Sequence, residues 1–347
     1  GHAEIPSCVT SIGEAAFKSI NNLTSITIPS SVISIGKSAF ESSKLVSITF
    51  SPGSQLESIG EKAFYKASSL TSIIIPASVK SIDKYAFEMY QYTSSTSLES
   101  VTFAEGSQLE SIGDYAFYEA RSLTSITIPD SVTSIGKAAF YDARSLTSIV
   151  IPASVKSIGE SAFKMHYHES NKLESVTFAE GSQLESIGSD AFYYTSQLTS
   201  ITIPDSVTSI GSRAFSSSGA LNDVTIVVSD EEINSNNFPD FTSVFGGNFT
   251  NVTIIDSNGD LAPSCDSDGN LMWAWIYLID DNGHAEIPSC VTSIANNAFY
   301  ATSSLTSITI PDSVTSIGEK AFYATRSLTS VTFAEGSQLE SIGDYAF

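Results

Sequence analysis

Two histidines and a carboxylate lie within four residues of each other, where they could bind a metal ion. His166 and His168 flank a tyrosine, and Glu169 follows directly. Imidazole and carboxylate groups are zinc ligands, but a structural zinc site has four protein ligands. Without a fourth ligand the pattern is a weak metal motif. We therefore expect neither a metal nor another cofactor at this position.

Two acidic segments have the alternating oxygen ligands of calcium-binding loops. They contain Asp256, Asn258 and Asp260, and then Asp266 and Asp268. Neither segment has the glycine at position 6 or the glutamate at position 12 that an EF-hand loop needs. A loose calcium site that stiffens the segment is one interpretation. A solvated acidic linker is the other, and the sequence favours it.

The three cysteines allow one disulfide. Cys8 and Cys290 occupy the same place in a duplicated GHAEIPSC segment, and Cys265 lies 25 residues before Cys290. A disulfide between Cys265 and Cys290 would leave Cys8 unpaired and would indicate an oxidising compartment. Three reduced thiols are the alternative, and the sequence does not decide between them.

No catalytic constellation can be recognised in the chain. It has four histidines and three cysteines in 347 residues, and no glycine-rich phosphate loop or Ser/His/Asp arrangement stands out. The net charge of −22 disfavours binding to nucleic acid or to anionic membranes, both of which need clustered Lys and Arg. The apolar stretch 271–279 is too short to span a bilayer. We expect a protein that is not an enzyme and does not insert into membranes.

A repeated unit must position any functional residues. Its marker is the phenylalanine of an Ala-Phe pair, which recurs mostly every 23 to 25 residues, with two longer spacings of 30 and 29. A fixed period in the twenties is typical of a solenoid with one turn of chain per repeat. The markers are Phe17, Phe40, Phe64, Phe87, Phe117, Phe140, Phe163, Phe192, Phe215, Phe299, Phe322 and Phe347.

The unit reads L-x-x-I-x-I-P-x-x-V-x-x-I-G-x-x-A-F. Residues 125–128 alternate as a strand with Thr127 towards solvent, and Pro129 lacks an N–H and ends that strand. A second extended segment follows, and Gly136 permits a bend that a side chain would hinder. Phe140 then fills a third corner. Stacking of successive turns, about 4.8 Å apart, would bury the aliphatic and phenyl groups.

The motif LTSITIPDSVTSIG followed by x-x-A-F resembles the BspA-like, or Treponema-type, leucine-rich repeat. The resemblance covers nearly the whole chain outside 229–270. It implies a strand-rich leucine-rich repeat solenoid of parallel β coils, about 23 residues each, with loops and turns on the convex side. Family repeats often have cysteine three residues after the phenylalanine. This chain has small residues there instead: Ala67, Ala120, Ala143, Thr195, Thr302 and Thr325.

The repeat pattern divides into two blocks. It fades after residue 221, and we expect strands at 223–228 and 251–255 within a C-terminal cap at 221–255. Residues 1–255 would form the first block with its cap, and 256–269 an acidic linker. Residues 270–347 would form an N-terminal cap hairpin and a second, truncated repeat block.

The first residues of the chain indicate a longer protein. Residues 1–12 recur at 283–294, inside the second block. We therefore expect the chain to begin within a module and to be a fragment.

The outward positions of the expected strands carry hydroxyl groups, including those of Thr127 and Thr202. A soluble, β-favouring surface explains them most simply. A flat protein-binding face is the functional alternative, and a regular threonine array could also suit ice or a glycan.

The two long repeats carry insertions with aromatic residues. Tyr90 and Tyr92 lie in the first insertion, and His166, Tyr167 and His168 lie in the second. Both insertions follow the corner phenylalanine, three repeats apart, so they would emerge on one edge about 14 Å from each other. Exposed aromatics suit a contact hot spot, and we predict a partner-contact ridge. Two tolerated loop insertions are the alternative.

The resemblance supplies the expected function. Similar proteins are displayed on microbial or protist surfaces and adhere to host matrix proteins such as fibronectin and fibrinogen. We therefore expect a cell-surface or secreted interaction protein whose partner is a protein, with host matrix proteins as candidates. A rigid spacer that carries another domain is the alternative.

Overall fold

The computed structural model describes most of the chain. Its continuous described ranges are 1–89, 98–167, 171–218 and 305–347, and shorter pieces lie at 221, 223–228, 244, 251–256, 282–287, 289, 291–294, 296, 298–300 and 302. Several predicted site residues lie outside these ranges: Tyr90, Tyr92, His168, Cys265, Cys290, Asn258, Asp260, Asp266 and Asp268. Asp256 ends a strand of which only the backbone is described. The proposed disulfide, calcium loops and first insertion therefore stay predictions.

The chain forms two compact units. The first comprises Gly1–Asp223 with Pro239–Thr250, and the second Val224–Phe238 with Asn251–Phe347. The boundaries of blocks, cap and linker given above stay predictions.

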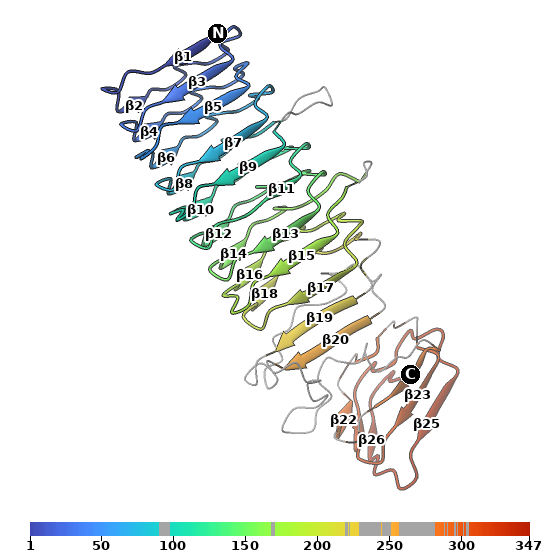
Figure 1. Cartoon of the computed structure of the whole chain (residues 1–347). Helices are drawn as coiled ribbons and strands as arrows, with labels where there is room; N and C mark the ends of the chain where they lie inside the picture. The colour runs from blue at the N-terminus through green and yellow to red at the C-terminus, as the bar shows by residue number, and fades with distance from the viewer. Residues whose placement is uncertain are drawn as a thin grey trace. The chain divides into compact units, whose positions relative to one another are not determined.

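Each turn of the first unit contributes two strands. The first has four residues in most turns and we call it the longer strand, although one of them, Ser125–Ile126, has only two residues, and the second strand has two residues. The longer strands are β1 (His2–Glu4), β3 (Ser25–Ile28), β5 (Ser47–Phe50), β7 (Ser72–Ile75), β9 (Ser100–Phe103), β11 (Ser125–Ile126), β13 (Ser148–Ile151), β15 (Ser175–Phe178) and β17 (Ser200–Ile203). The short strands are β2 (Ser11–Ile12), β4 (Ser34–Ile35), β6 (Ser58–Ile59), β8 (Ser81–Ile82), β10 (Ser111–Ile112), β12 (Ser134–Ile135), β14 (Ser157–Ile158), β16 (Ser186–Ile187) and β18 (Ser209–Ile210). In Figure 1 the longer strands lie one below another from blue to green.

The short strands form one parallel sheet that runs through the first unit in the order β2 to β18. Equivalent residues pair across it, as Ser134 does with Ser157 and Ile135 with Ile158. A side-chain period of two means that a slip by one residue would turn every isoleucine outwards, so burial holds this register. The predicted solenoid of parallel coils, about 23 residues per turn, is confirmed.

A column of stacked phenyl rings forms the third corner of the coil. Consecutive rings from Phe17 to Phe215 lie 5.0–5.3 Å apart between centroids, with planes within 10° of parallel. The spacing matches that of neighbouring strands, so each ring fills the space that its copy leaves in the adjacent turn. The small residues three positions after the ring are buried, as the sequence suggested.

The backbone of this corner is not a strand but is still bonded from turn to turn. The residues two before and two after the phenylalanine have positive φ angles in most turns, such as 50° at Ala138 and 54° at Asp142, but Met89 and Met165 do not. Between them the N–H of Phe140 donates to the carbonyl of Ala162 at 2.7 Å. At the last marker, Phe215 donates instead to the carbonyl of Val244 at 3.0 Å, which occupies the place of a next turn.

The glycine before the corner is needed for space rather than for a bend. No positive φ angle is found at Gly136, but a Cβ atom there would lie 2.6 Å from the backbone nitrogen of Asp114. That is closer than real Cβ atoms come to backbone, so the turns can approach only where the side chain is absent. A side chain at Gly136 would thus be hindered, as predicted, but by the adjacent turn and without a positive φ angle at the glycine.

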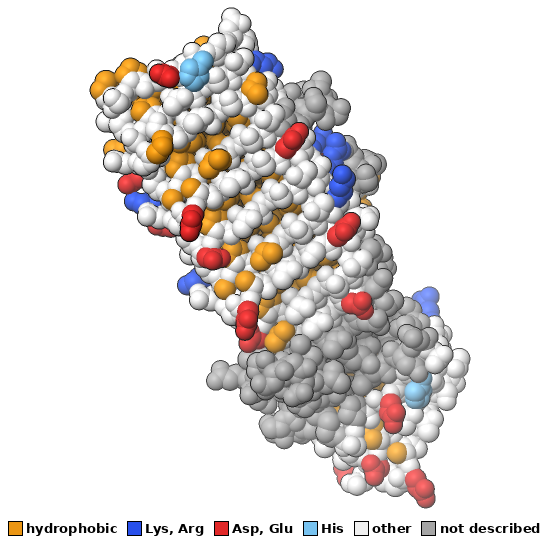
Figure 2. Space-filling model, viewed as in Figure 1, with side chains coloured by type: hydrophobic (Ala, Val, Ile, Leu, Met, Phe, Trp, Pro, Cys, Tyr) orange, Lys and Arg blue, Asp and Glu red, His pale blue; other side chains and the backbone are white. Residues whose placement is uncertain are grey.

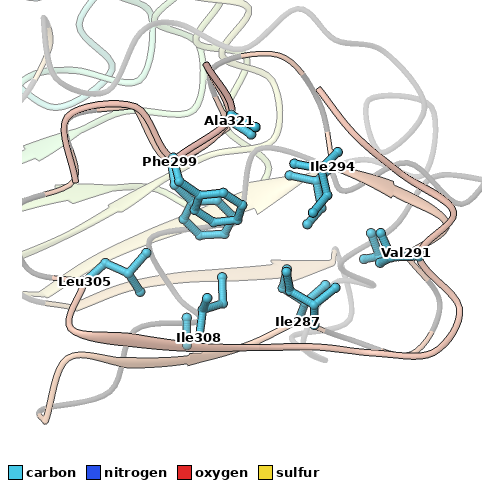
Figure 3. Packing of buried hydrophobic residues seen from close by; sticks show 13 residues of the cluster. Ile287, Val291, Ile294, Phe299, Leu305, Ile308 and Ala321 are labelled. Carbon is cyan, nitrogen blue, oxygen red and sulfur yellow. The ribbon is translucent and has the colours of Figure 1, made fainter. Parts of the chain in front are cut away.

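The second unit repeats the same coil. Parallel strands β21 (His284–Glu286), β23 (Ser307–Ile310) and β25 (Ser330–Phe333) form one sheet, and β22 (Ser293–Ile294), β24 (Ser316–Ile317) and β26 (Ser341–Ile342) form another. Strands β19 (Asp223–Val228) and β20 (Asn251–Asp256) are neighbours in a further sheet, as expected for 223–228 and 251–255. Figure 3 shows Ile287, Ile294, Leu305 and Ile308 directed inwards around the ring of Phe299.

Candidate functional site

The outward face of the longer strands of the first unit is the first candidate surface. Thr127 and Thr202 are exposed there, together with the equivalent Thr49, Thr102 and Thr177. Two turns depart from this pattern, because Ile74 and Val150 occupy the threonine position and are 62% and 55% exposed. Figure 2 shows hydrophobic side chains among the polar ones on this face. The face is therefore a hydroxyl array that two exposed aliphatic side chains interrupt.

An edge of aromatic rings beside the phenyl column is the second candidate surface. We call it the aromatic edge, and it comprises Tyr85, Tyr115, Tyr118, Tyr141, His166, Tyr167, Tyr194 and Tyr193. Successive rings in this order lie between 4.4 and 6.5 Å apart. The rings come from five consecutive turns, so they form one continuous line along the unit.

Two predicted contact residues of the second insertion, His166 and Tyr167, lie within this line, whereas His168 lies outside the described residues. The ring of His166 stands edge-on to Tyr141 at 5.9 Å, and Tyr167, which is 60% exposed, lies 5.9 Å from Tyr194. The sequence analysis missed Tyr141 and Tyr194, because they belong to the repeats and not to an insertion. Their signal was the recurrence of tyrosine one or two residues after the marker phenylalanine.

Cationic side chains lie against several of these rings. The Nζ atom of Lys84 is 4.9 Å from the centroid of Tyr85, and Lys164 Nζ is 4.7 Å from that of Tyr193. The guanidinium of Arg213 lies 5.4 Å from the same Tyr193 ring. Cations within about 6 Å of a ring face are attracted to it, so these contacts restrict the side chains of the edge.

Buried ion pairs anchor the edge from one turn to the next. Arg121 Nε donates to Asp142 at 2.8 Å, and a terminal nitrogen of Arg121 lies 2.9 Å from Glu119. Lys164, one turn before Asp190, and Arg213, one turn after it, both donate to the buried Asp190 at 2.8 to 3.1 Å, although Arg213 itself is 60% exposed. Burial raises the pKa of Glu119 above its ordinary value, although Arg121 opposes the shift.

Glu88 directly follows the marker Phe87, at the start of the first insertion. Its side chain is buried, and this burial raises the pKa of the Glu88 carboxyl to about 7, against the weaker opposing effect of Lys66. The carboxyl group therefore changes its charge near neutral pH, two residues before Tyr90 in the sequence.

The described residues give no support to a metal site or a membrane span. Within them, no three His, Cys, Asp or Glu side chains are grouped as a metal site would require. His168 and Glu169 lie outside that set, so the histidine pair is not tested. Cys8 is an exposed free thiol. No helix in the described part of the chain has the length and hydropathy to cross a membrane.

Comparison with known proteins identifies the repeat. The model of the BspA type leucine rich repeat region, in six copies, matches residues 2–104, 88–169, 165–259 and 282–347. A search of curated proteins found no match.

Two solved structures of bacterial leucine-rich repeat proteins are similar to this chain. A leucine-rich repeat protein from Bacteroides ovatus is 25% identical with a TM-score of 0.55, and the match covers 99% of this chain and 82% of that one. A leucine rich cell surface protein from Faecalibacterium prausnitzii is 27% identical with a TM-score of 0.47, covering 96% and 87% of the two chains.

Proposed function

The chain belongs to the BspA-type leucine-rich repeat family, and on this premise we propose that it is a non-enzymatic, protein-binding module outside the cell. In this function the coil is a rigid scaffold, and the aromatic edge is the principal contact surface. Its partner is a protein, for which host matrix proteins such as fibronectin and fibrinogen are the candidates that the family suggests.

The aromatic edge is the observation that carries the proposal. Tyrosine rings bury a large area at low entropic cost, and they are enriched where interfaces concentrate their binding energy. The edge is fixed in advance, because the rings stack on one another and the ion pairs of Arg121 and Asp190 link the turns that carry them. Such preorganisation reduces the entropy lost on binding.

Binding along a line of rings would distribute affinity over several turns. Each contact would be weak, and the total would grow with the number of turns engaged and with the number of copies displayed. The same geometry also suits a rigid spacer, which would show no binding at all. A binding measurement therefore separates the two functions.

The test uses immobilised fibronectin and fibrinogen and the whole chain in a surface plasmon resonance measurement. We expect the Tyr141→Ala/Tyr167→Ala double variant to weaken binding at least tenfold, whereas Tyr345→Ala should leave it unchanged. Tyr345 is a matched control, since it is an exposed tyrosine outside the aromatic edge. Circular dichroism and thermal melting would verify that both variants fold. Equal binding by the double variant and the wild type would exclude the edge, and failure to bind either matrix protein would favour the spacer.

The hydroxyl face needs its own variant. Thr127→Ala/Thr202→Ala removes two of its exposed hydroxyl groups without changing the core. If this variant loses binding to the matrix proteins and the tyrosine variant does not, the contact surface is the strand face and not the aromatic edge.

A further inference from the structure

Two forms of turn alternate irregularly in the first unit. In proline turns the sequence after the start of the longer strand reads Ile-Pro, as at Ile75-Pro76 and Ile128-Pro129. In phenylalanine turns the longer strand ends in phenylalanine and is followed by two additional residues and a glycine with positive φ, as at Phe50 with Gly53 and Phe103 with Gly106. The two forms differ in whether the residue after the strand has an N–H group that can bond to the preceding turn.

A phenylalanine turn that follows a proline turn is bonded to it. Ser51 N–H donates to the carbonyl of Ile28, and Ala104 N–H to that of Ile75, both at 2.9 Å. In the reverse order the donating position is occupied by Pro76 or Pro129, which has no N–H. The carbonyl groups of Phe50 and Phe103 therefore lose this bond from the next turn.

The sheet of longer strands is interrupted where proline removes the donor. Strands β5 and β7, β11 and β13, and β15 and β17 fall into different sheets, and the later strand of each pair ends at a proline. Strand β11 still pairs with β9, but through two residues only. Each interruption thus coincides with a proline that lacks the N–H group, although β3 and β11, which also precede prolines, still pair with the strand before them.

Grooves open on the strand face at two of the junctions with a preceding phenylalanine turn. The first, of about 380 Å³, is lined by Phe50, Pro52, Ile74, Pro76 and Ala104 among others. The second, of about 490 Å³, is lined by the same types of residue around Phe103, Thr127 and Pro129, and Ala104 borders both. Asp130 is the one charged residue in either lining.

The two grooves are separated by two turns of the coil. The rings of Phe64, Phe87 and Phe117, which mark these turns, are 5.0 and 5.3 Å apart in succession. The groove repeat is therefore about 10 Å along the stack. A polyproline II helix rises about 3.1 Å per residue with three residues per turn, so one side of it repeats every ~9.3 Å.

We propose that these two grooves bind a basic, proline-rich segment of a partner protein in the polyproline II conformation. Every third side chain of the segment enters a groove, and the segment lies along the stack across the longer strands. This inference rests on the protein-binding function proposed above and adds the chemical class of one ligand.

The chemistry of the grooves agrees with this ligand rather than with a helix or a strand. A polyproline II segment makes no internal hydrogen bonds, so its non-proline N–H groups are free to donate to the carbonyls of Phe50 and Phe103. An α-helix has already used its N–H groups, and a β-strand repeats every ~6.8 Å on one face. Grooves lined by aromatic rings and proline suit proline-rich ligands, and Asp130 with the net charge of −22 favours lysine or arginine between the anchors.

The test measures binding of a fluorescent peptide of four Leu-Lys-Pro repeats to the whole chain by anisotropy. The peptide has an apolar anchor at every third position, and a scrambled peptide of equal composition lacks that spacing. We expect saturable binding of the repeat peptide, at least tenfold weaker binding of the scrambled one, and weaker binding of a Leu-Glu-Pro peptide. Equal affinity for the repeat and scrambled peptides, or binding of an oligosaccharide without the peptide, would overturn the proposal.

Variants locate the site. Ile74→Thr removes an apolar wall of the first groove and installs the residue that neighbouring turns already carry, so the fold is retained. Pro129→Ala restores an N–H group that can bond to the Phe103 carbonyl and close the second groove. Both should weaken peptide binding at least fivefold. Val150→Thr is the matched control, because Val150 is an exposed aliphatic residue on the same face but outside both grooves, and it should have no effect.

The outcomes separate this inference from the proposed function. If Ile74→Thr and Pro129→Ala bind the peptide as the wild type does, the groove assignment is wrong even when fibronectin or fibrinogen still binds through the aromatic edge. If the peptide binds through the grooves but neither matrix protein binds, the groove assignment stands and the choice of matrix proteins fails.

Discussion

The phenyl rings of Phe140 and Phe163 stack with their centroids 5.2 Å apart and their planes 6° from parallel. The two residues are 23 positions apart in the sequence, one complete turn of the coil. Each ring has such a neighbour above and below in the middle of the first unit, so a single phenylalanine supports three turns. Stability along the unit consequently depends on contacts between neighbouring turns.

Removal of an internal ring should destabilise the first unit strongly. We expect Phe140→Ala to lower the free energy of unfolding by about 3–5 kcal/mol, because it leaves a cavity between two flat rings. Urea denaturation followed by circular dichroism measures this change. Phe17→Ala is the matched control, since Phe17 is only partly buried and stacks on a single ring in the described structure, and it should cost clearly less. Equal losses in the two variants would contradict a column stabilised from both sides.

The close approach of successive turns should make one glycine sensitive and another tolerant. A Cβ atom at Gly188 would lie 2.5 Å from the backbone nitrogen of Glu160, whereas one at Gly13 would meet no atom within 4 Å. Gly188→Ala should therefore lower stability by about 1–3 kcal/mol, as overpacking does. Gly13→Ala should be neutral or slightly stabilising. Thermal melting of the two variants checks this, and a tolerated Gly188→Ala would mean that the turns can separate locally.

The repeat made the fold predictable. Ile126, Thr127 and Ile128 alternate in burial and the corner Phe140 is buried, as their residue types suggested, although the strand ends at Ile126 and not at Pro129. The period specified the register as well, since identical turns leave no better pairing than residue on equivalent residue. The cause of the hindrance at Gly136 could not be predicted, because the distance between backbones in adjacent turns is a property of the stack.

The surfaces were predictable only in part. His166 and Tyr167 drew attention as an insertion, but their neighbours Tyr141 and Tyr194 became visible only when the turns were stacked. The grooves depend on the order of two turn types, and on a hydrogen bond that Pro76 cannot donate. The missing hydrogen bond becomes apparent only when two adjacent turns are considered together, and not from the sequence of either turn alone.

The buried pair of Arg121 and Asp142 should contribute more to stability than an exposed pair. Asp142→Asn keeps a residue that tolerates the positive φ angle at this position, but it leaves Arg121 without its closest charge partner. We expect a loss of about 3 kcal/mol, at the lower end for a broken buried pair, since Glu119 still lies beside Arg121. Glu61→Gln breaks the exposed pair with Lys37 and should cost less than about 1 kcal/mol. Similar losses in both variants, measured by urea denaturation, would show that the buried pair has no special weight.

The carboxyl group of Glu88 should make stability depend on pH in the direction opposite to an ordinary salt-bridged acid. Its pKa is raised to about 7 in the folded chain by burial, from an ordinary value of 4.5. Between these two values the folded state holds a proton that the unfolded state has lost, so stability falls as pH rises through this window. The full effect for one group is about 3 kcal/mol at pH 8. Below pH 4.5 the carboxyl is protonated in both states and the effect vanishes.

Glu88→Gln isolates this contribution, because glutamine resembles the protonated acid in shape and in its lack of charge. The variant should match the wild type at pH 4 and be more stable by about 1–3 kcal/mol at pH 8. The difference between the two proteins, measured by urea denaturation at several pH values, should rise mainly between pH 4.5 and 7. A difference that does not change with pH would show that Glu88 is ionised in the folded chain. Its contacts with Lys66 and Lys62 would then outweigh the cost of its burial.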